Sequence, residues 1–272
     1  MLPARLHVFA STLLLAVAAQ AGPVNDTGID FCRENASGAD TPISANTTCT
    51  PLPTHGAQDA RYGRDAAAAR GVLPKVGASS LSVHGNPNGF DYTKVSNAGA
   101  DLPASATLGP NPGDWACTRD NHTGLLWEVK VNDAAHPRHM GHTYTWYFGA
   151  NTYGGPGTAS GGSCATPGRC DTEKFAQDVN ASNGGQGLCG HTDWRVPTLQ
   201  ELYNLADRGR TSPAIDPLYF PNTRAWYFWS GSPVAGDPDG AWLVDFAYGG
   251  GGVDGWNPRS DALAVRLVRG GQ

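Results

Sequence analysis

The stretch "HTDWRVPTLQEL", residues 191–202, carries the local signals that decide the fold. Thr198 and Glu201 stand three residues apart, which is the spacing of a helix capping box. In this motif the threonine oxygen accepts a hydrogen bond from the glutamate amide, and the glutamate side chain accepts one from the threonine amide. Pro197 disfavours helical backbone at Val196, so the helix begins after the proline. The stretch therefore predicts a corner that leads from an extended segment into a helix.

Apolar residues follow the cap at helical spacing and predict one buried face for this helix. They are Leu199, Leu202, Leu205 and Ala206. Two residues before the cap are not explained by helix signals. We expect Trp194 to lie in the core and Arg195 to be held in a buried or half-buried polar network.

The N-terminus has the layout of a secretory signal peptide. Arg5 precedes a mainly apolar run, Val8 to Ala19, and Ala19-Gln20-Ala21 forms a small-x-small cleavage site. The run is too short to span a bilayer, and no later stretch is apolar enough for a membrane helix. We expect residues 1–21 to be removed and the mature protein to be exported to the periplasm, the cell surface or the medium.

Six cysteines follow the predicted cleavage site. An even number of cysteines in an exported chain is typical of a disulfide framework. No C-x-x-C spacing and no paired Cys/His spacing supports the alternative of a zinc site. The sequence allows several pairings, and we favour two that close short local loops and a third that joins the remaining cysteines. The favoured pairs are Cys32–Cys49, Cys164–Cys170 and Cys117–Cys189.

Composition divides the chain near residue 110. The 36 Gly and 20 Pro favour turns and short strands over a helical bundle. All eight tryptophans lie between Trp115 and Trp256. We therefore predict an irregular N-terminal extension over residues 22–110, packed on a single domain over residues 111–272. The formal net charge of −5 and the lack of a basic run argue against nucleic acid as a partner.

The expected domain combines short strands with two helices. Alternation of apolar and polar residues between turn-rich clusters predicts the strands. Their ranges are 124–130, 143–148, 226–230, 241–247 and 262–268. One helix is predicted from Asp171 as its cap and Glu173 in its first turn. Its buried face carries Phe175 and Val179, and Gly184 ends it. The capping box begins the second helix.

Five segments occur in an order that resembles a bacterial family. They are "CTRDNHTGLLWEVK" (117–130), "LCGHTDWRVPTLQEL" (188–202), "YFWSGSP" (227–233), "AWLVDF" (241–246) and "AVRLVRG" (264–270). Together they resemble the Lcl C-terminal domain family, named after a Legionella collagen-like surface protein. The upstream "YGRDAAAA" (62–69) and "GFDYTKVSNAG" (89–99) are similar to segments that precede this domain in exported relatives.

The resemblance implies an α+β fold related to C-type lectins and formylglycine-generating enzymes. In that group an R-[LV]-P-T-x-x-E corner begins a core helix. It matches Arg195, Val196, Pro197, Thr198 and Glu201 here. The corner occurs in enzymes and in binding domains, so it indicates fold and not chemistry. The namesake protein is implicated in adhesion to polysaccharide with the help of a collagen-like stalk, whereas this chain has no Gly-x-y repeat.

The sequence lacks the residue patterns of enzymes that share the implied fold. Formylglycine-generating enzymes use a late cysteine pair, whereas no cysteine follows Cys189. The His-x-x-x-His-x-Glu motif of the sulfoxide-forming iron enzymes is also absent, as is the Gly-x-Ser-x-Gly elbow of hydrolases. We therefore assign no catalytic residues and predict a non-catalytic protein.

Two segments resemble metal sites in part. Three imidazoles, His136, His139 and His142, could ligate zinc. A proline and a glycine between them indicate an exposed polar loop instead. The acidic turn "GDPDG" (236–240) could contribute to a calcium site, but it lacks the about six to eight oxygen ligands that calcium needs. We expect no cofactor, with calcium at this turn as the alternative.

One loop is favoured for ligand binding, "YGGGGVDGWNPRSD" (248–261). Its glycines give backbone freedom, and its aromatic and polar side chains can stack on a sugar or hydrogen-bond to it. The proposed contacts are Tyr248, Asp254, Trp256, Asn257 and Arg259. The alternative is that Trp256 packs in the core and that the glycines only permit a turn.

These observations favour an exported binding or adhesion domain whose ligand is a polysaccharide or a surface protein. The alternative is a structural or assembly subunit of a surface filament or envelope complex, in which the N-terminal extension docks onto a neighbouring subunit. Under this second hypothesis the protein could assemble into homo-oligomers or filaments. An enzyme of the formylglycine-generating type is the third.

Overall fold

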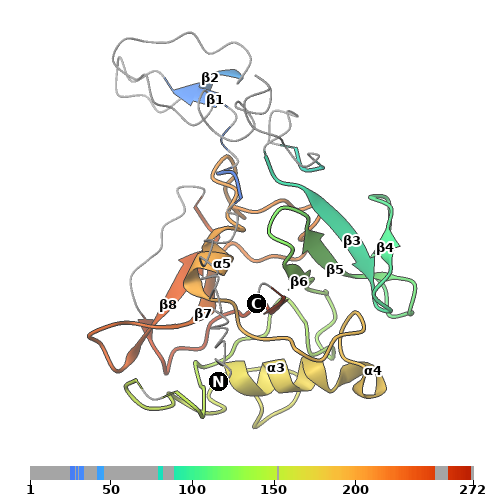
Figure 1. The fold of residues 1–272 in the computed structure, drawn as a ribbon. Coiled ribbons are helices and arrows are strands. Elements are labelled where there is room, and N and C mark those ends of the chain that lie inside the picture. The colour runs from blue at the N-terminus through green and yellow to red at the C-terminus, as the bar shows by residue number, and fades with distance from the viewer. Residues whose placement is uncertain are drawn as a thin grey trace, which may run out of the picture.

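Short antiparallel strands and few helices make up the fold, which is of the α+β class (Figure 1). The computed structural model describes residues 25–27, 29, 79–81, 89–151, 153–248 and 257–270, and the backbone of 31–33 and 42–45. The strands are β1 (Phe31–Arg33), β2 (Pro42–Ala45), β3 (Tyr92–Ser96), β4 (Asp101–Leu102), β5 (Trp115–Asp120), β6 (Leu126–Glu128), β7 (Tyr227–Pro233), β8 (Gly240–Asp245), β9 (Asn257–Pro258) and β10 (Val268–Arg269). The helices are α3 (Thr172–Asn180), α4 (Ser182–Gly185) and α5 (Leu199–Tyr203).

The larger sheet has five strands in the order β10-β6-β5-β3-β4, and each neighbouring pair is antiparallel. Its β6 confirms the strand predicted over 124–130, although the paired part is shorter. β3 and β4 precede residue 110, and β3 pairs along the length of β5. The boundary that composition indicates near residue 110 therefore falls inside one sheet, in the turn-rich connection from β4 to β5.

β3 was not predicted because a lysine interrupts its apolar pattern. Lys94 is buried, with only 8% of its surface exposed. Its ammonium group donates to the carbonyl of Ala106 at 2.8 Å and lies 3.9 Å from the ring centroid of Trp115. A carbonyl and an aromatic face thus replace water around the charge. Burial lowers the pKa of Lys94, and the carboxylate of Asp216 opposes that shift.

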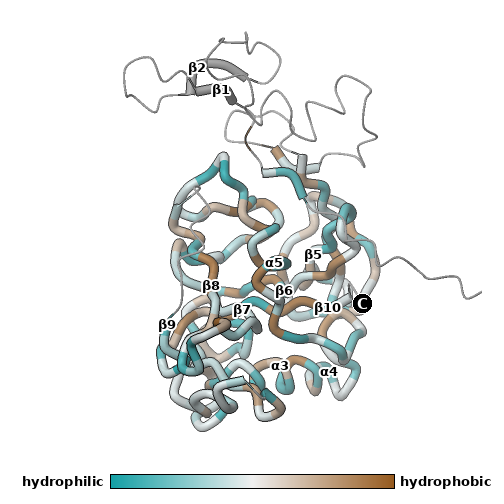
Figure 2. Tube along the Cα trace, turned by 60° about the vertical axis from the view of Figure 1, so that its left-hand side comes forward, coloured by the Kyte–Doolittle hydropathy of each residue, from teal (hydrophilic) through white to brown (hydrophobic). Residues whose placement is uncertain are grey.

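The smaller sheet, β7-β8-β9, confirms the strands predicted over 226–230 and 241–247. β8 separates two hydrophobic clusters, because successive side chains of a strand point to opposite faces. Leu243 belongs to the first cluster with Trp229, its partner on β7. Val244 belongs to the second with its partner Phe228. Figure 2 shows hydrophobic residues along β8 and around α5, between the polar outer loops.

Two predicted strands are largely wrong. Residues 143–148 form isolated bridges, and of residues 262–268 only Val268 lies in a strand. The backbone of the first segment pairs with several separate loops instead of one partner strand. The amide of Tyr144 donates to Leu263, whereas the amide of Trp146 donates to Arg259. The apolar alternation at these positions reflects burial of the side chains and does not indicate continuous pairing with a neighbouring strand.

Both predicted helices are present. Asp171 caps α3 and accepts a hydrogen bond from the amide of Lys174, and the predicted core residues Phe175 and Val179 are buried. Gly184 follows in the short α4 with a φ of +67°. The second helix, α5, is shorter than its apolar pattern suggests. Leu205 and Ala206 are buried as that pattern predicts, but they lie beyond the end of the helix. Among the described residues, no helix has the length and apolar character to cross a membrane.

The corner before α5 confirms the capping box. The Thr198 hydroxyl accepts from the amide of Glu201 at 3.3 Å, and a Glu201 carboxylate oxygen accepts from the amide of Thr198 at 2.8 Å. The guanidinium of Arg195 donates to both oxygens of the same carboxylate, at 2.8 and 2.7 Å, and to the carbonyl of Gly270 at 3.1 Å. Trp194 is buried, as predicted. Arg195 is half-buried in a polar network, also as predicted.

Two of the favoured disulfides are formed. Cys117 on β5 is joined to Cys189 in the segment before the corner, across a sequence separation of 72 residues. Cys164 and Cys170 close a local loop before α3. The pair Cys32–Cys49 and the predicted signal peptide, residues 1–21, lie outside the part of the chain for which side chains are described.

Described parts of the N-terminal extension contact the domain through polar groups. The Asn25 amide donates to the carboxylate of Asp120 at 2.6 Å. The amide of Arg208, beyond α5, donates to the carbonyl of Thr27 at 2.7 Å. Ser80 donates from its hydroxyl to the buried carboxylate of Asp216. These contacts extend the packed structure to residues far upstream of the larger sheet.

Removing the Glu201 side chain is expected to destabilise the fold more than removing the cap alone. Glu201→Ala loses the cap and leaves the half-buried Arg195 without its carboxylate, so the free energy of unfolding should fall by about 2–3 kcal/mol. Thr198→Ala should cost about 1 kcal/mol. Gln200→Ala, at an exposed position of the same helix, is the control and should lower the free energy of unfolding by less than about 0.5 kcal/mol. Equal losses for the first two variants in chemical denaturation would contradict a stabilising role for the Arg195–Glu201 pair.

The buried carboxyl group of Asp207 makes stability depend on pH. Burial raises its pKa from 3.8 to about 6, despite hydrogen bonds from Gly209 and Arg210. Because the folded state holds this proton more tightly than the unfolded state does, its stabilising effect is full below about pH 4 and lost as the pH rises to about 6. The loss is of the order of 3 kcal/mol.

Asp207→Asn should therefore flatten the decline in the free energy of unfolding between about pH 4 and pH 6, measured by denaturant titration at each pH. Asp133→Asn, at an exposed aspartate, should leave the decline unchanged. An unaltered slope in Asp207→Asn would contradict this assignment.

Candidate functional site

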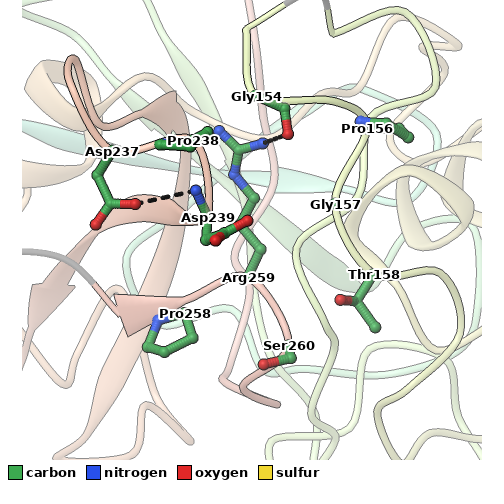
Figure 3. A pocket seen from close by; sticks show the side chains of 10 residues that line it. All are labelled: Gly154, Pro156, Gly157, Thr158, Asp237, Pro238, Asp239, Pro258, Arg259 and Ser260. Atoms are coloured by element: carbon green, nitrogen blue, oxygen red, sulfur yellow. Dashed lines mark hydrogen bonds between the residues drawn. The ribbon is translucent and has the colours of Figure 1, made fainter.

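A cleft of about 640 Å³ lies where three segments meet (Figure 3). One wall is the loop 154–158, which follows the irregular segment 143–148. The second is the turn 237–239 between β7 and β8. The third is the end of β9 and the residues after it, 258–260. The lining residues are Gly154, Pro156, Gly157, Thr158, Asp237, Pro238, Asp239, Pro258, Arg259 and Ser260.

Arg259 joins two walls of the cleft. Its Nε donates to the carbonyl of Gly240, at the start of β8, at 3.1 Å. Its two terminal nitrogens donate to the carbonyls of residues 153–155, at 3.2, 3.3 and 2.9 Å. The guanidinium carbon lies 4.4 Å from the ring centroid of Trp146, which is buried beneath it. We call this set of contacts the Arg259 clamp.

The loop and the turn also contact each other directly. Gly154 has a φ of +70°, and a Cβ atom at this position would lie 2.3 Å from the carbonyl oxygen of Pro238. Only glycine therefore permits both this backbone conformation and this close approach. The amide of Gly236 donates to the hydroxyl of Tyr153. The walls are thus held to each other by contacts within the protein itself.

The polar side chains of the lining residues carry mainly oxygen atoms that can accept hydrogen bonds. One oxygen of Asp237 accepts from the amide of Asp239 at 3.0 Å, which orders the turn (Figure 3). The Asp239 side chain is exposed. Thr158 and Ser260 add hydroxyls from the other two segments. Burial lowers the pKa of Arg259, and the carboxylates of Asp239 and Asp237 oppose that shift, so the three charges lie within one electrostatic environment.

The sequence-predicted contacts are only partly brought together. Arg259 lines the cleft, but it is 3% exposed and its donors are directed at backbone carbonyls. Asn257 lies on the neighbouring β9, and its side-chain amide donates to Asp261 at 2.8 Å. Tyr248 is 70% exposed and does not line the cleft. The remaining two, Asp254 and Trp256, lie outside the described residues.

Sequence reasoning missed the loop wall. The sequence of this loop is the turn-forming run "YGGPGT", residues 153–158. Its partner in the cleft lies about a hundred positions later, and no local pattern links the two segments. The acidic turn 236–240, which resembles a calcium site in part, supplies the wall with Asp237 and Asp239. Within the described residues, no three His, Cys, Asp or Glu side chains are grouped so as to hold a metal ion.

The three histidines of the 136–142 loop are engaged locally. Nδ1 of His136 accepts from the amide of Arg138 at 3.0 Å, and Nδ1 of His139 accepts from the amide of Gly141 at 3.2 Å. Nε2 of His142 lies 3.1 Å from the carbonyl oxygen of His136 and donates to it. Burial lowers the pKa values of His136 and His142. These contacts order the loop, and the rings of His139 and His142 pack against each other with centroids 5.0 Å apart.

Comparison with known proteins identifies the family. The model of the Lcl C-terminal domain matches residues 116–269, more than half of the chain. The chain belongs to the Lcl C-terminal domain family. Within this Lcl C-terminal domain lie all three walls of the cleft, whereas β3 and β4 precede the matched range. No curated protein and no solved structure matches the chain.

Arg259→Lys is expected to loosen the cleft although it keeps the charge. A lysine ammonium group is a point donor and cannot reach the carbonyls on both walls, as the planar guanidinium does. The free energy of unfolding should fall by about 2 kcal/mol, and amide hydrogen exchange over residues 153–158 should accelerate. Arg119→Lys, at an exposed Arg119–Asp101 pair, is the matched control with less than about 1 kcal/mol. Unchanged exchange in Arg259→Lys would contradict the clamp.

Proposed function

We propose that this Lcl C-terminal domain protein is an exported, non-catalytic binding protein whose ligand, a polysaccharide or a surface protein, occupies the cleft between residues 154–158, 237–239 and 258–260. The observation that carries the proposal is the rigid construction of this cleft. Its walls are held together by the Arg259 clamp and by the contact of Gly154 with Pro238. A preformed site loses little conformational entropy when a ligand binds.

Two features support export. The N-terminal residues 1–21 have the pattern of a signal peptide. The disulfides Cys117–Cys189 and Cys164–Cys170 are typical of proteins that fold in an oxidising compartment. We place the protein in the periplasm, on the cell surface or outside the cell.

A fold related to C-type lectins and formylglycine-generating enzymes is part of the proposal. It is supported by the α+β class, by the antiparallel sheets, and by the corner at 195–201 that the resemblance associates with this group. In lectin-like domains, late loops commonly form the binding surface. Here the cleft is lined by Pro258 of β9 and by the two residues that follow it.

The test is a screen of the mature protein against a polysaccharide array and against surface-protein extracts, with a variant that fills the cleft. Ser260 is exposed and lines the cleft, so Ser260→Trp should block entry without disturbing the core. We expect Ser260→Trp to lower the binding affinity by about tenfold or more, which is a loss of at least about 1.4 kcal/mol of binding free energy. Thermal unfolding should be unchanged.

Ser105→Trp, at an exposed serine outside the cleft, is the matched control and should bind like the native protein. Equal binding by both tryptophan variants would show that the cleft is not the site. Failure of the native protein to bind any array member or surface protein would contradict the binding function itself. A large assembly purified from the native envelope would then favour the structural-subunit alternative.

A further inference from the structure

Resting on the proposed binding function, we infer that the cleft selects saccharides that present neighbouring free hydroxyls and carry no acidic substituent. The ligand class is therefore a neutral or amino sugar, and not a sulfated or uronic-acid polymer. Three features of the lining residues support this inference, namely the carboxylates, the occupied guanidinium donors and the proline rings, and the net charge of the whole chain is a fourth.

The carboxylates of Asp237 and Asp239 supply strong acceptors. An ionised carboxylate accepts through two oxygens and several lone pairs, and only one oxygen of Asp237 is used by the turn. Two hydroxyls on adjacent sugar carbons can donate to one carboxylate, and such charge-assisted hydrogen bonds are about twice as strong as neutral ones. The same carboxylates repel a sulfate or a uronic acid brought into the cleft.

The guanidinium of Arg259 does not offset that repulsion. Most of the N–H donors of this guanidinium are used in hydrogen bonds to the carbonyls of Gly240 and residues 153–155. The side chain therefore offers no bidentate fork to an anion, which is how arginine recognises carboxylate and sulfate groups. Among the described residues that line the cleft, Arg259 is the only cation.

The remaining lining suits a sugar ring. Pro156, Pro238 and Pro258 each contribute a side-chain ring to the lining, from different walls. Their apolar C–H surfaces can pack against the C–H face of a pyranose, while the hydroxyls of Thr158 and Ser260 can either donate or accept at its edge. A cleft of about 640 Å³ also lies within the usual range of small-ligand sites.

The charge of the whole chain acts in the same direction. Its formal net charge is −5. Long-range repulsion slows the approach of a polyanion, whereas it leaves a neutral glycan unaffected and favours an amino sugar. Direct contacts and the long-range field therefore exclude the same class of ligand.

The experiment measures binding of three soluble oligosaccharides of equal length to the mature protein by calorimetry: a neutral glucan, a deacetylated chitin fragment and a sulfated glycan. We expect the first two to bind and the sulfated one to bind at least about thirtyfold more weakly. Asp237→Asn/Asp239→Asn should weaken binding of the neutral oligosaccharide by about tenfold or more, because two charged acceptors become neutral. Asp133→Asn is the matched control at an exposed aspartate outside the cleft.

The outcomes separate the two proposals. Stronger binding of the sulfated glycan than of the other two would overturn the selectivity. If Ser260→Trp abolished that binding, the cleft would still be supported as a binding site. Neutral-glycan binding that is unchanged in Asp237→Asn/Asp239→Asn would overturn the carboxylate contacts. Loss of neutral-glycan binding on addition of a chelator would show that a cation mediates the contact, against the direct hydrogen bonds inferred here. No binding to any of the three, with capture of a surface protein, would overturn the inference and leave the binding function.

Discussion

The bidentate contact between Arg195 and Glu201 fixes the corner through which the two sheets are joined. The backbone of Arg195 exchanges hydrogen bonds of 2.9 Å in both directions with Val268 on β10, an edge strand of the larger sheet. On the other side, the carbonyl of Pro197 accepts from the amide of Gly231 on β7 at 2.7 Å. Glu201 holds both the guanidinium of Arg195 and the helix cap, so one carboxylate connects the segment that pairs with β10 to the start of α5.

This joint determines where the cleft can form. β7 leads directly into the acidic turn, and β8 and β9 return from it, so the orientation of the smaller sheet sets two of the three walls. The third wall comes from the loop 154–158 and is attached by the Arg259 clamp. The corner therefore orients the smaller sheet, and with it two walls of a cleft that the corner residues do not line.

The sequence predicts this structure where a few neighbouring residues suffice. A capping box over four positions, a proline before it and an aspartate before the first helix are local signals, and all of them hold. The cleft could not be predicted, because its contacts join residues about a hundred positions apart: Arg259 and Gly154 are separated by 105 residues. Arg259 was predicted to contact a ligand and it lines the cleft, yet only the structure shows that its donors bind backbone carbonyls. β3 was not predicted for a related reason: the buried Lys94 is stabilised by the carbonyl of Ala106 and the ring of Trp115, which lie outside its own strand.

The central claim is that a clamped cleft with two carboxylates binds a non-acidic saccharide directly. A crystal structure of the mature protein with a neutral oligosaccharide tests it most directly. We expect the sugar to lie between the three walls, with neighbouring hydroxyls within hydrogen-bond distance of Asp237 and Asp239. The guanidinium of Arg259 should still donate to its backbone carbonyls. A sugar bound elsewhere with the cleft open, or a guanidinium turned from the carbonyls to the ligand, would contradict it.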